Sequence, residues 1–298
     1  MTTRVLVTIP APVPALDGSV EAVYGPIGSA PDAEALLVGP TDRVDGAVLD
    51  SMPSLSVVAV AGAGTDAVDQ DAISARGITL VSAPEATVVP TAELTVCLIL
   101  MVSRGVPAAV AELDDQTWPG WAFDHVVGRG VAGLTLGLVG YGRIARRVAD
   151  MAAALGMTVL HHRRTPSEEP GFRAALPDLL AASDVVSIHV PRTPETVNLI
   201  GTREIALMPR GSVLVNTSRG GIVDEDALLR ALASGHLSGA GVDVFVAEPG
   251  IPSRLLGVPN LVVTPHIGSA TAQARAGMAE EAAAHLLAAL DERRGRFR

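Results

Sequence analysis

Three side chains in the last third of the chain have types that suit one kind of chemistry. Arg219 lies in Asn-Thr-Ser-Arg-Gly-Gly, Glu248 in Asp-Val-Phe-Val-Ala-Glu-Pro, and His266 in Thr-Pro-His-Ile-Gly-Ser-Ala-Thr. A guanidinium can hold a carboxylate and polarise a carbonyl with its planar set of donors. A histidine titrates near neutral pH, so with a carboxylate partner it can give a proton to a nascent alkoxide. The combination suits the reduction of a 2-keto acid.

Taken one at a time, each of these residues has a structural alternative. An arginine can cap a turn, a glutamate can lie on a solvated loop, and a histidine can be a hydrogen-bonded core residue. Each segment, however, directly follows a predicted strand, over 213–216, 239–244 and 261–264 respectively. Carboxyl ends of strands in an open α/β sheet meet at one crevice, so we expect the three side chains to converge there.

A glycine motif follows an earlier strand, predicted over 135–139. The run Gly140-Tyr141-Gly142-Arg143-Ile144-Ala145 matches G-x-G-x-x-G/A and opens a helix predicted over 144–155. The first glycine permits a tight turn, the second lets the backbone approach a pyrophosphate, and the helix N-terminus offers N–H donors to that anion. A purely structural glycine turn is the alternative. With a strand before it and a helix after it, the motif predicts a dinucleotide site that includes Gly140, Gly142, Arg143 and Ile144.

The end of the next strand, predicted over 158–160, carries no acidic residue. In this fold an acid at that place binds the ribose 2′-OH of NAD, whereas this chain has His161-His162-Arg163-Arg164. Arginine suits bidentate recognition of a phosphate, so Arg163 and Arg164 predict NADP(H) as the preferred cofactor, with NAD as the second choice. The alternative is that the two arginines are solvated surface charges.

Short apolar runs alternate with helix-compatible segments along the chain, which is the pattern of a parallel sheet covered by helices. We therefore predict an α/β fold with two doubly wound parallel-sheet domains, a flavodoxin-like substrate domain and a Rossmann cofactor domain. Strands are predicted over 5–9, 35–38, 57–60 and 79–81 in the first, and over 135–139, 158–160, 185–189, 213–216, 239–244 and 261–264 in the second. Further helices are predicted over 66–76, 91–104, 177–182, 225–234 and 270–293, the last packing back on the first domain. The predicted domains are residues 1–98 with 268–298, and residues 99–267.

The composition excludes several classes of function. Of 298 residues 48% are hydrophobic and 18% charged, which is enough to form the cores of two domains. The net charge of −10 provides no electrostatic footprint for nucleic acid. All 22 basic residues are arginine, so a lysine Schiff base and a P-loop lysine are excluded.

The single cysteine and the N-terminus bear on metal, redox state and location. Cys97 is the only cysteine, which excludes an intrachain disulfide and a cysteine metal site. It lies in an apolar run over 94–102, which is far shorter than the roughly 20 residues that span a bilayer. The N-terminus reads as a strand followed by prolines instead of a signal peptide. We expect a cytoplasmic protein with no membrane partner, no nucleic-acid partner and no metal.

Four segments, over 138–146, 185–196, 215–228 and 261–271, resemble the signatures of the D-isomer-specific 2-hydroxyacid dehydrogenases. The resemblance covers nearly the whole chain. It implies that Arg219, Glu248 and His266 are the catalytic set and that Asp243 holds the nicotinamide carboxamide. It also implies cofactor contacts at Pro191, Thr217, Ser218 and Gly268. In the first domain, Gly62 and Ala63 resemble the loop whose backbone N–H groups bind the substrate carboxylate, although glycines there also suit a plain tight turn.

Within that family, the chain is most similar to the glyoxylate and hydroxypyruvate reductases, which share the arginine after the second strand and the Pro-His-Ile-Gly-Ser-Ala-Thr ending. In those reductases a tryptophan reaches across a dimer interface to cover the neighbour's substrate. Trp121 corresponds to it here, with ordinary dimer packing as an equal alternative. The resemblance thus implies a homodimer that reduces a small 2-keto acid to the D-2-hydroxy acid. Arg192 departs from the family pattern, as either a cofactor phosphate contact or a surface charge.

Two other functions stay open. An NAD-dependent dehydrogenase that oxidises a D-2-hydroxy acid, including phosphoglycerate-like acids, would use the same three side chains and the same glycine motif. A dinucleotide-sensing corepressor would share the fold without turnover. The complete set of Arg219, Glu248 and His266 disfavours the corepressor.

Overall fold

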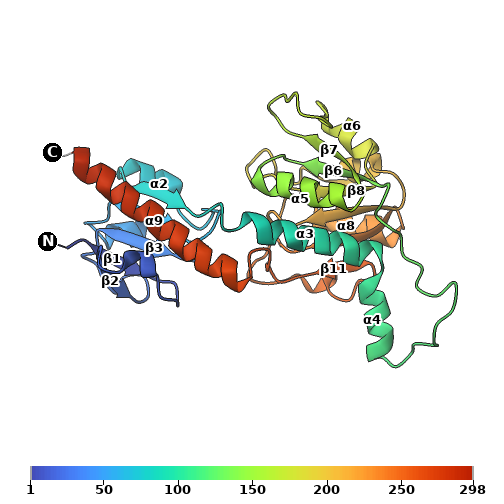
Figure 1. Cartoon of the computed structure of the whole chain (residues 1–298), viewed down its shortest axis with the longest axis horizontal. Coiled ribbons are helices and arrows are strands. Elements are labelled where there is room, and N and C mark those ends of the chain that lie inside the picture. Colours follow the sequence, from blue (N-terminus) through green and yellow to red (C-terminus); the bar gives the residue numbers. More distant parts are fainter. Residues whose placement is uncertain (1, 297–298) are drawn as a thin grey trace. The chain divides into compact units, whose positions relative to one another are not determined.

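The computed structural model describes residues 2–296, which form two compact units (Figure 1). One unit consists of the chain up to Val88 together with the chain from Ser269 onward, and the other runs from Val89 to Gly268. The predicted boundary between residues 98 and 99 falls inside helix α3 (Val88–Ser103). The helix belongs almost entirely to the second unit because Ala92, Leu98 and Ile99 are buried in its core.

In the first unit, the described residues form a sheet of five parallel strands in the order β2-β1-β3-β4-β5. This is the flavodoxin-like order, so the predicted fold of this domain is confirmed. The strands are β1 (Arg4–Val7), β2 (Glu21–Tyr24), β3 (Ala35–Val38), β4 (Val57–Val60) and β5 (Thr79–Ser82). Sequence patterns did not predict β2, because it is an edge strand whose first and last residues are exposed and interrupt any apolar run.

Helices cover both faces of this first sheet. Helices α1 (Gly46–Asp50) and α2 (Gln70–Ala75) bury Leu49 and Ile73 against one face. The long helix α9 (Ala272–Arg296) buries an apolar side against the other, together with a short 3₁₀ helix, Pro14–Leu16. The C-terminal helix therefore packs on the first unit, as predicted. Helix α2 begins later than expected because the Asp69 side chain caps it.

In the second unit, the described residues form a sheet of six parallel strands in the order β11-β10-β9-β8-β6-β7, which confirms the predicted strand number. The strands are β6 (Thr135–Val139), β7 (Thr158–His162), β8 (Val185–Ile188), β9 (Ser212–Asn216), β10 (Leu237–Val242) and β11 (Leu261–Val263). A single bridge from His161 to Phe172 extends the sheet beyond β7. The strand order reverses between β6 and β8, where a doubly wound sheet forms its ligand crevice.

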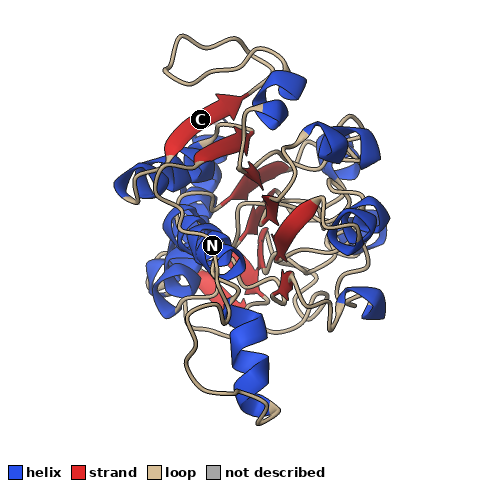
Figure 2. Ribbon diagram, turned by 90° about the vertical axis from the view of Figure 1, so that its right-hand side faces the viewer, coloured by secondary structure: helices blue, strands red, loops and turns tan. Residues whose placement is uncertain are grey.

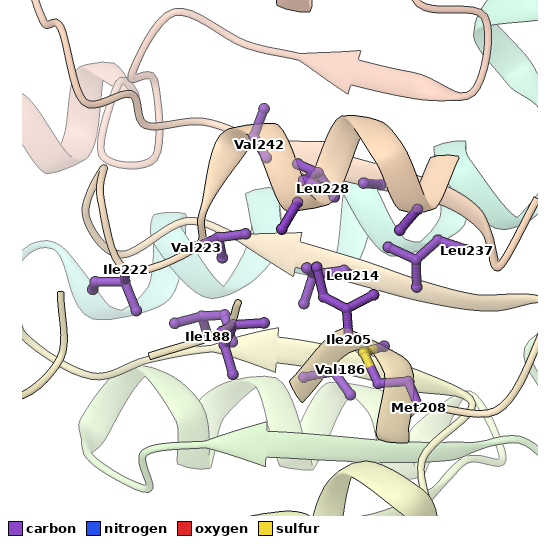
Figure 3. Packing of buried hydrophobic residues seen from close by; sticks show 14 of the residues in the cluster. Val186, Ile188, Ile205, Met208, Leu214, Ile222, Val223, Leu228, Leu237 and Val242 are labelled. Carbon is purple, nitrogen blue, oxygen red and sulfur yellow. The ribbon is translucent and has the colours of Figure 1, made fainter. Parts of the chain in front are cut away.

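Two helical layers enclose this second sheet, which is why its strands are mostly apolar. On one face lie α3 and α5 (Arg143–Ala154). On the other lie α6 (Leu176–Ala181), α7 (Thr202–Leu207) and α8 (Glu225–Ala233). Figure 3 shows Leu228 of α8 and Ile205 of α7 packed over Leu214 and Val186 of the central strands. A 3₁₀ helix, Ser253–Leu255, precedes β11.

Helix α4 (Val106–Asp114) and the loop after it project from this unit (Figures 1 and 2). None of the α4 residues is buried. Over residues 2–296 no single helix is both long and apolar enough to cross a membrane, and α3 and α4 meet that test only as a pair bent by 68°.

Candidate active site

The glycine motif forms a cradle at the carboxyl end of β6. Gly140 has a φ of +92°, and a Cβ built on it would lie 2.6 Å from the His189 carbonyl oxygen, so only glycine fits. Gly142 is the N-cap of α5, no side chain caps the helix, and the space at its missing Cβ is open. An N-terminus of a helix without a side-chain cap suits an anion such as a dinucleotide pyrophosphate. Arg143 and Ile144 open the helix, with Ile144 packed against the core.

The arginine pair follows β7 in the loop over 163–171. The Arg163 Nε donates to the Thr165 carbonyl oxygen at 3.0 Å, and Arg164 is exposed. In β7, just before the arginine pair, the His161 ring is fully buried and stacks on Tyr141 of the glycine motif, with 3.7 Å between ring centroids. Burial lowers the pKa of His161, so the ring is neutral at physiological pH. The loop thus starts next to the glycine cradle.

The loop after β9 is organised by Asn216. Its Oδ1 accepts from the Ser218 N–H at 3.0 Å and the Ser218 hydroxyl at 2.8 Å, and its Nδ2 donates to the Arg219 carbonyl oxygen at 2.9 Å. Thr217 is buried, with its hydroxyl 2.7 Å from that of Thr95. The Arg219 Nη1 donates to the Ser218 carbonyl oxygen at 2.7 Å. Sequence reasoning gave Asn216 no role, although an asparagine at a strand end followed by a small polar residue is a turn signal.

Gly220 brings this loop against the loop that follows β10. A Cβ built on Gly220 would lie 1.9 Å from the Phe245 carbonyl oxygen, so the two backbones touch where no other residue fits. Arg219 and Glu248 are therefore carried by loops in direct contact. The sequence motif contains Gly220 but does not predict this contact, since the contact depends on which strands are neighbours.

His266 and Glu248 form a hydrogen-bonded pair. The His266 Nδ1 lies 2.7 Å from Glu248 Oε2, and both side chains are about half-buried. The other carboxylate oxygen, Oε1, accepts from the Phe245 N–H at 2.8 Å, which fixes the orientation of the carboxylate. Because a carboxylate only accepts, Nδ1 of His266 carries a proton in this contact. Nε2 is then the ring nitrogen through which the imidazole can exchange a proton with a ligand.

Asp243 holds the loop that carries His266. Its fully buried carboxylate accepts from the Thr264 hydroxyl at 2.6 Å and from the N–H groups of Ile267 and Gly268 at 2.8 Å each. The backbone carbonyl oxygen of Asp243 accepts from the His266 N–H at 2.9 Å, and His266 has a φ of +52°. Burial raises the pKa of Asp243, while these hydrogen bonds act in the opposite direction. Sequence reasoning gave Thr264 no role.

The other predicted site residues lie as follows. The Pro191 carbonyl oxygen accepts from the Thr196 hydroxyl at 2.7 Å at the carboxyl end of β8, and Gly268 is buried in the loop after β11. Trp121 is 84% exposed in the loop after α4. Gly62 and Ala63 belong to the other unit, in the loop after β4, where Gly62 is buried against Pro40 and Ala63 is exposed. The described residues include no group of three or more His, Cys, Asp or Glu side chains placed to hold a metal ion.

Arg192 lies at the carboxyl end of β8, against the loop after β9. Its Nε is 3.5 Å from the place a Cβ would take on Gly221. The side chain is exposed.

Residues 96–268 match the family model described as "D-isomer specific 2-hydroxyacid dehydrogenase, NAD binding domain". The chain is 42% identical over 280 residues to a D-3-phosphoglycerate dehydrogenase of Mycobacterium bovis, covering 89% of this chain and 52% of that protein. It therefore spans about half the length of that relative. It is 40% identical over 266 residues to a glyoxylate reductase of Thermococcus litoralis, covering 86% of this chain and 80% of the relative.

The chain is also similar in three dimensions to a solved structure. An NADPH-dependent glyoxylate/hydroxypyruvate reductase from Sinorhizobium meliloti, in complex with NADP and malonate, superposes with a TM-score of 0.83 at 30% identity. The likeness covers 95% of this chain and 92% of that one. With a glycine cradle at β6, loops from β9 and β10 in contact, and a family model matched over most of the second unit, the chain belongs to the D-isomer-specific 2-hydroxyacid dehydrogenases.

Proposed function

We propose that the protein reduces a small 2-keto acid of the glyoxylate or hydroxypyruvate type to the D-2-hydroxy acid, with NADPH as the preferred cofactor. The observation that carries the proposal is the 2.7 Å contact between His266 Nδ1 and Glu248 Oε2. Glu248 lies on the loop after β10, which touches the loop that holds Arg219. A bound nicotinamide cofactor supplies the hydride that reduces the carbonyl carbon. The protein supplies the cation, the proton and the geometry.

Each side chain has a role in this proposal. Arg219 binds the substrate carboxylate and polarises the keto oxygen, which accumulates negative charge as the hydride arrives. His266 donates a proton from Nε2 to that oxygen, and Glu248 stabilises the protonated ring through Nδ1. Asp243 holds the His266 loop through its hydrogen bonds to Thr264, Ile267 and Gly268, and the family resemblance implies that it also holds the nicotinamide amide.

Charge after β7 supports the preference for NADPH. Arg163 and Arg164 stand where an acid would bind the 2′-OH of NAD, and a guanidinium pairs well with a phosphate. Gly140, Gly142 and the uncapped first turn of α5 would hold the pyrophosphate. Pro191, Thr217 and Ser218 complete the proposed cofactor contacts at the ends of β8 and β9.

The test is to follow the absorbance of NADPH and, separately, of NADH while glyoxylate, hydroxypyruvate, pyruvate, 3-phosphohydroxypyruvate and bulkier keto acids are supplied to purified protein. We expect fast consumption of NADPH with glyoxylate or hydroxypyruvate. Activity with NADH alone would contradict the role of Arg163 and Arg164, and reduction of 3-phosphohydroxypyruvate in preference to the small acids would favour a phosphoglycerate-type enzyme. Tight cofactor binding without turnover on any of these acids would favour the corepressor.

We also propose that two copies of the chain pair through α4. Eight large apolar side chains of α4 and the following loop are exposed, namely Val106, Val110, Leu113, Trp118, Trp121, Phe123, Val126 and Val127. Helices α3, α4 and α5 line an apolar groove of about 1000 Å³. Val106, Val110, Leu113 and Val126 of the exposed set are among its lining residues, together with Leu100 and Leu155. An exposed apolar surface of this kind is typical of a protein interface. A second copy of the same chain is the occupant that the family resemblance implies.

Sedimentation of the purified protein tests the pairing. We expect a dimer that the double substitution Val110→Glu and Leu113→Glu converts to monomer. Trp121→Ala should raise KM for the keto acid if this side chain covers the neighbour's substrate, and should leave KM unchanged if it only packs in the interface. A wild-type monomer at micromolar concentration would contradict the proposed pairing.

A further inference from the structure

The loop that carries Arg163 and Arg164 is attached to the sheet at its base. It leaves β7 after His162 and returns at Phe172, projecting from the edge of the sheet (Figures 1 and 2). The His161 N–H donates to the Gly171 carbonyl oxygen at 3.0 Å, and the Arg173 N–H donates to the His161 carbonyl oxygen at 2.8 Å. These bonds fix the two ends of the loop and leave the position of its middle to side chains.

A second attachment holds the loop from the side. Arg146 of α5 makes a two-point contact with Glu169, one of whose bonds, from Nη2 to Oε1, is 2.7 Å long. The guanidinium of Arg146 also lies over the Tyr141 ring, 4.6 Å from its centroid, and Tyr141 stacks on His161. Arginine, tyrosine and histidine thus form a continuous column that joins the glycine motif to β7. Glu169 connects the loop to this column.

Glu169 lies in the same loop as Arg163, whose positive charge is predicted to bind the phosphate. The Arg146 hydrogen bond is the main reason that the pKa of Glu169 lies below its ordinary value, and the positive charge of Arg163 acts in the same direction. Glu169 therefore interacts favourably with a cation on α5 and with one in its own loop. A carboxylate in that place either fixes Arg163 for a phosphate or repels the phosphate, and the two cases predict opposite effects of neutralising it.

We propose that the Arg146–Glu169 contact is a latch that holds the loop over 163–171 where Arg163 can bind the 2′-phosphate of NADPH, so that Glu169 is a positioning residue for cofactor choice. The inference rests on the proposed preference for NADPH. Both partners are partly exposed, which limits the strength of the ion pair, but the two-point geometry is the strong form of an arginine–carboxylate contact. We expect its loss to weaken phosphate binding by about two- to fivefold.

The experiment compares Glu169→Gln with wild type and with Glu168→Gln, in which the neighbouring carboxylate is neutralised instead. Calorimetry of the cofactor-free protein gives Kd for adenosine 2′,5′-bisphosphate and for 5′-AMP, which differ in the 2′-phosphate. We expect E169Q to raise Kd for the bisphosphate by about two- to fivefold with little change for 5′-AMP, and E168Q to change neither. Amide hydrogen exchange over 163–171 should become faster in E169Q alone.

The other outcomes each overturn a distinct statement. Wild type that prefers the bisphosphate, combined with E169Q that binds it equally or more tightly, would overturn the latch and leave the NADPH preference intact. Equal weakening of both ligands would show that Glu169 supports the whole cofactor domain, which also overturns the latch. Wild type that binds both ligands equally would overturn the NADPH preference, and the role of the latch in it, at once.

Discussion

Gly220 lies so close to Phe245 that a Cβ atom on the glycine would be 1.9 Å from the phenylalanine's carbonyl oxygen. The contact joins the loops after β9 and β10 through their backbones. It sets how near Arg219 can come to Glu248 and His266. Any side chain at position 220 must separate these loops.

The first prediction concerns this contact. Gly220→Ala should push the two loops apart, at a cost of about 1–3 kcal/mol in stability, as for other overpacked sites. We expect a lower Tm and a loss in kcat/KM. Gly130→Ala is the matched control, because the space at its missing Cβ is open and its φ is not positive. Wild-type kcat/KM in the Gly220→Ala protein would show that the contact does not matter for the site.

The second prediction concerns the proton donor. His266→Ala should lower kcat by about 10²–10⁴, the usual contribution of general acid catalysis, while cofactor affinity is kept. Steady-state kinetics and cofactor titration measure the two effects separately. His285→Gln serves as the control, since that side chain bonds to the Ser82 carbonyl oxygen in the first unit. Full activity of the His266→Ala protein would contradict the proposed mechanism.

The third prediction concerns the cation. Arg219→Ala should raise KM for the keto acid and lower kcat, because the same guanidinium is proposed to bind the carboxylate and to polarise the carbonyl. The loss in kcat should be on the order of 10²–10³, the typical effect of removing one oxyanion donor. Arg203→Ala, in the exposed part of α7, should leave both constants unchanged. An unchanged KM in the Arg219→Ala protein would remove the carboxylate-binding role.

The fourth prediction concerns stability in acid. Burial lowers the pKa of His189 to about 4, and its Nε2 lies 2.9 Å from the Ser187 hydroxyl. Between pH 6.5 and pH 4 the unfolded chain takes up this proton more readily than the folded protein. The contribution of neutral His189 is therefore complete above pH 6.5 and is lost as the pH falls towards 4, with a slope of at most about 1.4 kcal/mol per pH unit.

Urea unfolding at pH 7, 6 and 5 measures this slope. His189→Gln should give a shallower dependence of the unfolding free energy on pH than wild type, because glutamine has no proton to gain. His161, whose pKa burial also lowers, is present in both proteins and contributes to both curves. Parallel curves for the two proteins would contradict the assignment.

Much of the fold could be predicted because the strands are buried on both faces. The strands over 35–38, 57–60 and 135–139 have the predicted bounds, since each is an apolar run that ends where the chain leaves the core. The strand predicted over 239–244 ends instead at Val242. Asp243 and Val244, the last two residues of the predicted strand, already belong to the loop. Both are as buried as the strand itself, and Val244 is as apolar, so the residue pattern does not show where the strand ends.

The candidate site could be predicted in its residue types and only partly in its contacts. The position of His266 and Glu248 after neighbouring strands follows from the parallel sheet, and the structure brings the two within 2.7 Å. The hydrogen bonds of Asp243 and the approach of Gly220 to Phe245 depend on loop geometry at the sub-ångström level. Residue type carries no such information. The exposure of α4 could not be predicted either, because an apolar helix has the same sequence pattern whether a domain core or a partner chain covers it.

Helix α9 has a consequence for the order in which the protein can fold. Its Met278, Ala282 and Leu286 complete one core of the first unit, whose strands β1 to β5 are made before residue 83. On the ribosome that sheet emerges with one face covered only by the 3₁₀ helix Pro14–Leu16, and it stays so until the whole of the second unit has been synthesised. The unit made first is therefore the one finished last, and a chaperone that shields an apolar sheet face would act on the N-terminal part of the nascent chain.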